Sequence, residues 1–89
     1  MRRDVVDTHT VTVRYFAGAR AAAGRVEEDA PAGLDRDGFV AELTSRHGDR
    51  LGRVLSAASF LVDGTVWHDR HAPLPAGATV DVLPPFAGG

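Results

Sequence analysis

The chain has 89 residues, which is room for a single hydrophobic core, because a chain of this size buries only about 60–65% of its extended surface on folding. Its net charge of −2 comes from ten arginines and twelve acidic residues spread along the chain, so neither nucleic acid nor a membrane is expected as a partner. Cysteine and lysine are both absent, which excludes disulfides, thiolate metal sites, a cysteine nucleophile and isopeptide bonds to an internal lysine. No segment approaches the roughly 20 apolar residues that span a bilayer, and we expect a cytoplasmic protein.

The N-terminal part predicts an extension followed by a strand. Residues 1–8 are polar and unpatterned, so we expect a flexible N-terminal extension ahead of one domain at residues 9–89. Thr10–Phe16 alternates and is rich in β-branched and aromatic residues, which indicates a strand. One face of that strand carries Val11, Val13 and Tyr15, and the other carries Thr12, Arg14 and Phe16.

Two short elements follow. The alanine-rich stretch 17–23 favours one or two helical turns that Gly24 is placed to end. Residues 26–30 favour a short second strand, which the breakers at 31–33 close.

The middle of the chain predicts the main helix and a shorter one. Asp35 or Asp37 can cap a helix whose apolar positions are Phe39, Val40 and Leu43, and Gly48 ends it. A further short helical segment is expected around residues 51–55.

The remaining elements are strands. Ser59–Val62 is an extended apolar run, and Asp63–Gly64 is a two-residue hairpin signal, so residues 65–68 should turn back against it. A proline-containing loop at 71–77 leads into the alternating strand 79–83, which Pro84–Pro85 stops because proline has no N–H for a sheet ladder.

This order predicts an α+β domain with helices packed on one face of a mixed sheet. If Val80 and Val82 face the helices together with the first strand's valines, the opposite face carries Phe16 and Leu83. Two large apolar side chains on a solvent face, close to an apolar tail, indicate a surface for a partner protein.

Residues 84–89 form the expected tail, which reaches roughly 20 Å when extended. The prolines stiffen its base, and Gly88 and Gly89 fit a narrow channel because they have no Cβ. A terminal carboxylate becomes reactive as an acyl-adenylate made from ATP, and sulfur attack then gives a thiocarboxylate. A Gly-Gly pair alone is a weak signal, since it occurs by chance at a chosen place in roughly 0.5–1% of chains.

Three motifs of this chain are Val13-Arg14-Tyr15-Phe16-Ala17-Gly18-Ala19-Arg20, Leu61-Val62-Asp63-Gly64 and Leu83-Pro84-Pro85-Phe86-Ala87-Gly88-Gly89. Together they resemble the MoaD/ThiS family of ubiquitin-like β-grasp sulfur carriers. The first and last are most similar to the branch that contains the small subunit of molybdopterin synthase. Two features depart from the family pattern: the turn at 75–78, where many relatives have Asp-Gly-Asp, and the N-terminal extension.

The resemblance implies a protein co-substrate, not an enzyme acting alone. An E1-like enzyme would use ATP to adenylate Gly89, with Gly88 giving access, and the thiocarboxylate tail would enter a large synthase subunit; the carrier would bind no cofactor itself. The resemblance also implies that Phe16 and Leu83 contact both partners and that Arg20 pairs with an acidic group on the activating enzyme. The tail residues expected to bind a partner are Pro84, Pro85, Phe86 and Ala87.

Several alternatives remain at this point. The sulfur could serve thiamine, cysteine, tRNA or secondary-metabolite synthesis, and the chain could instead be a ubiquitin-like protein modifier or a plain interaction module. His68, Asp69 and His71 suit no common metal-ligand spacing, so no metal site is expected. Trp67 is expected to pack on the domain, with a partner contact as its alternative.

Overall fold

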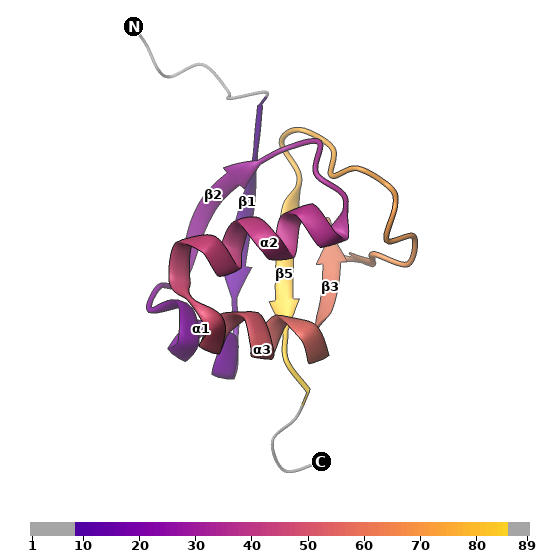
Figure 1. Ribbon diagram of the computed structural model, residues 1–89. Coiled ribbons are helices and arrows are strands. Elements are labelled where there is room, and N and C mark those ends of the chain that lie inside the picture. Colours follow the sequence, from indigo (N-terminus) through magenta and orange to yellow (C-terminus); the bar gives the residue numbers. More distant parts are fainter. Residues whose placement is uncertain (1–8, 86–89) are drawn as a thin grey trace, which may run out of the picture.

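The computed structural model describes residues 9–85 and places five strands in one mixed sheet (Figure 1). The strands are β1 (Thr10–Tyr15), β2 (Glu27–Pro31), β3 (Ser59–Val62), β4 (Thr65–Val66) and β5 (Thr79–Leu83). Their order is β2-β1-β5-β3-β4, and β1 pairs with β5 in parallel while the other three pairs are antiparallel. The first and last strands of the domain are therefore neighbours at the centre of the sheet.

Three helices cover one face of this sheet, as Figure 1 shows. They are α1 (Ala17–Ala23), α2 (Arg36–His47) and α3 (Asp49–Ala57). The predicted α+β arrangement, with the helices on a single face, is confirmed. No helix within residues 9–85 is long and apolar enough to cross a membrane.

The core lies between the helices and the inner sheet face, and it follows the predicted alternation. Val11, Val13 and Tyr15 of β1 are buried, as are Val80 and Val82 of β5. From the helices, Phe39, Leu43, Leu51 and Leu55 complete the core. Trp67 is also buried, and its ring makes edge contacts with Phe39 and Phe60 at centroid distances of 5.8 and 6.2 Å. The prediction that Trp67 packs on the domain is confirmed.

Local signals fix most of the element ends. Of the two possible caps, Asp35 is the one used: its carboxylate accepts a hydrogen bond from Gly38 N at 2.9 Å, which satisfies a free N–H at the start of α2. The hairpin turn has positive φ at both Asp63 (49°) and Gly64 (85°), as a type I′ turn requires. Gly48, with φ of 99°, ends α2 as predicted.

Three boundaries differ from the sequence predictions. β1 ends at Tyr15, and Phe16 becomes the extended residue before α1. The second strand lies one residue later than predicted, at Glu27–Pro31. The return strand β4 stops at Val66, because the N–H of His68 bonds to the carbonyl of Val66 and turns the chain away from the sheet.

Candidate functional site

The base of the tail lies at one end of the two central strands. Because β1 and β5 are parallel, Leu83 ends β5 at the same end of the sheet where Phe16 follows β1. Pro84 is half-buried and Pro85 is exposed. The strand β5 contacts α1, and Figure 1 shows both ending at the same end of the sheet. The predicted site residues Phe86, Ala87, Gly88 and Gly89 lie outside the described residues, as does the expected extension at 1–8.

The outer sheet face brings the two predicted docking side chains to this end. Phe16 and Leu83 are both half-buried, and Leu83 pairs with Ser59 of β3. The same face carries Leu61 and Val66, which pair with each other across the β3–β4 hairpin. Val66 is 46% exposed, a large exposure for an apolar side chain. We call the set Phe16, Leu61, Val66 and Leu83 the docking face.

Leu61 and Val66 were missed in the sequence analysis, although the sequence holds the signal that identifies them. A two-residue turn at 63–64 pairs 62 with 65 and 61 with 66. Since Val62 faces the core, Leu61 and its partner must face outward. The register of the predicted hairpin therefore extends the predicted face by two apolar side chains.

A polar clamp lies in the middle of the docking face. Arg14 Nε and Nη2 donate to the two carboxylate oxygens of Asp81 at 2.6 and 2.9 Å. Its guanidinium also lies over the ring of Phe16, 5.9 Å from the centroid. The hydrogen bond and charge of Asp81 raise the pKa of Arg14, so the guanidinium stays a cation. The clamp thus supports Phe16 next to the tail.

Arg20, the predicted contact to an activating enzyme, lies on α1 at this same end. Arg20 is exposed, and its Nε donates a hydrogen bond to the carbonyl of Tyr15 at 3.2 Å. That bond ties the side chain to the end of β1, near Phe16. The fold therefore places Arg20 where it can meet a protein that covers the tail.

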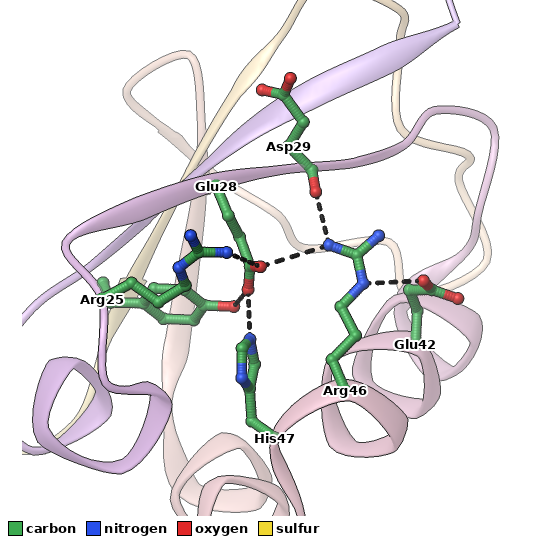
Figure 2. Close-up of polar contacts among 7 residues, drawn as sticks. Arg25, Glu28, Asp29, Glu42, Arg46 and His47 are labelled. Carbon is green, nitrogen blue, oxygen red and sulfur yellow. Dashed lines mark hydrogen bonds and ion pairs between the residues drawn. The ribbon is translucent and has the colours of Figure 1, made fainter.

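A second polar cluster lies on the helix side of the sheet and is built around Glu28 (Figure 2). The Glu28 side chain is only 6% exposed, and it accepts bonds from the Tyr15 hydroxyl and His47 Nε2, both at 2.5 Å. Arg25 and Arg46 approach its other oxygen at 3.2 and 3.3 Å. Burial alone would raise the pKa of Glu28, but the hydrogen bonds from Tyr15 and His47 outweigh it and lower that pKa.

This cluster joins three elements rather than facing a partner. Tyr15 belongs to β1, Glu28 to β2 and His47 to the end of α2. Burial, together with the hydrogen bond to Glu28, raises the pKa of Tyr15, which therefore stays a neutral donor. Both oxygens of the Glu28 carboxylate already accept bonds within the cluster. We therefore assign the cluster as a structural tie, which holds these three elements together, and not as a reactive site.

Metal binding finds no support within residues 9–85, where no group of three His, Asp or Glu side chains is placed to hold an ion. His68 and His71 are exposed, and Asp69 accepts a bond from the backbone N of His71 at 2.9 Å. Asp69 thus orders its own loop.

Comparison with known proteins identifies close structural relatives. A model of the ThiS family matches residues 13–89. A protein from Pyrococcus furiosus assigned as molybdopterin converting factor, subunit 1, is 26% identical with a TM-score of 0.74, over 88% of this chain and 99% of that one. Small archaeal modifier protein 1 from Methanosarcina acetivorans is 22% identical with a TM-score of 0.76, over 91% and 97%.

A third solved structure is a complex of subunits 1 and 2 of the molybdopterin-converting factor from Helicobacter pylori. The matching chain is 22% identical with a TM-score of 0.65, over 90% of this chain and 99% of that one. No curated protein matches the chain significantly. The fold is the predicted ubiquitin-like β-grasp.

Proposed function

The chain belongs to the ThiS family, and from that premise we propose that it is a sulfur carrier whose terminal residue, Gly89, is the working group. An E1-like enzyme adenylates the Gly89 carboxylate with ATP, and a sulfur donor then converts it to a thiocarboxylate. One structural observation supports this most: the central strand β5 runs directly into Pro84–Pro85 beside an apolar face. A tail that starts from a central strand has a fixed origin and direction.

The chemistry follows from the tail's composition. The carboxylate oxygen attacks the α-phosphorus of ATP and pyrophosphate leaves; hydrosulfide from the sulfur source then attacks the acyl carbon, AMP leaves, and loss of the S–H proton gives the thiocarboxylate. Gly88 and Gly89 present no Cβ near that carbon, so the attacking group meets little steric resistance. Six residues from 84 to 89 span at most about 20 Å, enough to enter an enclosed site while the domain stays outside. The carrier supplies one atom, and its partners supply catalysis.

The docking face is the surface to which the partner proteins bind. Phe16 and Leu83 supply apolar area next to the base of the tail, Val66 extends that area toward the β4 edge, and Arg20 supplies a charge near Phe16. Pro84 and Pro85 limit the freedom of the tail, which reduces the entropy lost when it is threaded. Phe86 and Ala87 would lie in the channel ahead of the reacting glycine.

For the acceptor, we infer the large subunit of a molybdopterin synthase. Support comes from relatives described as subunit 1 of molybdopterin converting factor, one of them in complex with subunit 2. A second candidate, a ubiquitin-like modifier joined to target lysines, is favoured by the likeness to small archaeal modifier proteins. Carriers for thiamine, cysteine or secondary-metabolite synthesis would use the same tail and face.

Intact-mass measurement tests the proposal. The full chain is incubated with ATP, the E1-like enzyme of the same organism and a sulfur source. We expect a mass increase equal to replacement of one oxygen by one sulfur. Deletion of Gly89, or addition of one residue after it, should abolish that change and leave the melting temperature intact. Conjugates to other proteins would instead favour the modifier, and no change of any kind would refute both.

A further inference from the structure

Arg36, the first residue of α2, is an unusual arginine. Its guanidinium lies over the rings of Phe60 and Trp67, 5.8 and 5.5 Å from their centroids. Its Nε is buried without a hydrogen-bond partner, and within residues 9–85 no carboxylate lies at ion-pair distance from it. The arginines that do pair with carboxylates in this part of the chain are Arg14, Arg25, Arg46 and Arg70.

A hollow of about 210 Å³ adjoins this guanidinium. Arg36, Ser59 and His68 contribute its polar lining, and none of the lining residues that the structure describes is acidic. The hollow holds several times the roughly 30 Å³ that one water molecule occupies in the liquid. It is therefore large enough for a side-chain carboxylate and is lined by groups that can donate to one.

The hollow borders the docking face. Val66, the most exposed member of that face, lines it. So does Ser59, which pairs with Leu83 at the base of the tail. A protein seated on the docking face would therefore also cover the hollow and remove water from Arg36.

A protein that covers Arg36 removes water from its guanidinium, and the free-energy cost of that loss determines which chemical group the partner must supply. A cation that loses its water without gaining an acceptor is strongly destabilising, so a well-matched partner must bring one. A carboxylate is the best match, because it can accept two parallel N–H bonds from a guanidinium. Stacking on two buried rings already orients the planar group, which lowers the entropy lost on pairing.

We infer that Arg36 receives an acidic side chain of the adenylating enzyme when that enzyme seats on the docking face. The inference rests on the proposed function. The adenylating enzyme is chosen because every candidate pathway for the sulfur requires it, whereas the acceptor differs between pathways. Arg36 is thus a recognition residue at the β4 edge of the face and takes no part in the reaction at the tail.

The experiment measures steady-state adenylation of the carrier by the E1-like enzyme of the same organism. Arg36→Met keeps an apolar stem over the rings but removes the charge. Arg36→Lys keeps the charge but loses the planar guanidinium that can donate two parallel N–H bonds. We expect Arg36→Met to raise the KM for the carrier about tenfold with kcat unchanged, and Arg36→Lys to raise it less. The control Arg50→Glu, an exposed residue of α3, should leave KM within about twofold.

The dependence of KM on salt concentration distinguishes an ionic contact of Arg36 from a purely structural role, because a structural role would leave this dependence unchanged. For the wild type, KM should rise with salt concentration, and for Arg36→Met that slope should be shallower. Unchanged KM and slope in a folded Arg36→Met variant, alongside normal adenylation of the wild type, would overturn this inference alone. A wild type that is never adenylated would overturn the proposed function as well. If Arg36→Met fails to fold, Arg36→Lys decides the question by the same two measurements.

Discussion

Replacing Glu28 by Gln tests whether the buried cluster in Figure 2 holds the domain together. The change keeps the shape of the side chain but removes the negative charge that Tyr15, His47, Arg25 and Arg46 all approach. These partners come from β1, from the end of α2 and from the turn before β2. The substitution therefore loosens the attachment of β2 to both its neighbouring strand and the end of α2.

The size of the effect follows from burial. Bonds to a charged, buried group contribute about 1.5–3 kcal/mol each, and Tyr15 and His47 both make one to the 6%-exposed Glu28. The side chain of Arg25 is 54% exposed, so its pair with Glu28 adds little. Since Gln keeps one acceptor oxygen, we expect a net loss of about 2–4 kcal/mol. At about 4–8 °C per kcal/mol for a domain of this size, the melting temperature should fall by roughly 8–32 °C.

Urea denaturation of both proteins measures the loss, and Glu42→Gln is the matched control. The Glu42 side chain is 36% exposed and, within residues 9–85, bonds only to Arg46, four residues along α2, so its replacement should cost no more than about 0.5 kcal/mol. A loss at Glu28 no larger than the loss at Glu42 would refute the assignment of the cluster as a structural tie.

Acid provides an independent check on Glu28. Its pKa is lower in the folded state than the ordinary value of 4.5, so its contribution to stability is present above that value. The contribution disappears as the pH falls through the lowered, folded-state pKa. The stability difference between wild type and Glu28→Gln should therefore be constant near neutral pH and shrink below about pH 4.5.

Two further predictions concern the main helix and the docking face. Asp35→Ala removes the cap of α2 and should lower the free energy of unfolding in urea by about 1 kcal/mol, whereas Asp37→Ala should cost clearly less; equal losses would contradict the capping role of Asp35. Leu83→Asp places a charge on the docking face and should raise the KM for adenylation about tenfold or more while the far-ultraviolet circular dichroism stays unchanged; an unaltered KM would remove this face from the interface.

The sequence predicted those parts of the fold that depend on nearby residues. Alternation identified Val11 and Val13 as core, and the pair Asp63–Gly64 identified a hairpin whose two positive φ angles the structure contains. The end of α2 was likewise marked by Gly48. In each of these places local backbone preference and burial favour the same conformation, so tertiary contacts had nothing to override.

The parts that could not be predicted depend on contacts between distant elements. Glu28 looks like an exposed residue of an acidic strand until β1 and α2 bring Tyr15 and His47 to it. Arg36 looks like an ordinary helix-start arginine until β3 and the segment after β4 place Phe60 and Trp67 beneath it. For the candidate site, Phe16 and Leu83 followed from strand alternation alone, and Val66 required the hairpin register.

The position of β5 has a consequence for how the protein is made. Arg14 and Asp81 meet across the central parallel pair although 67 residues separate them, so the sheet can close only after almost the whole domain has been synthesised. A chain that the ribosome abandons before residue 79 lacks its central strand and its tail at once. Truncated products therefore lack both the strand that closes the sheet and the residues proposed to react, so a partner that recognises the closed sheet would meet only chains whose synthesis has passed β5.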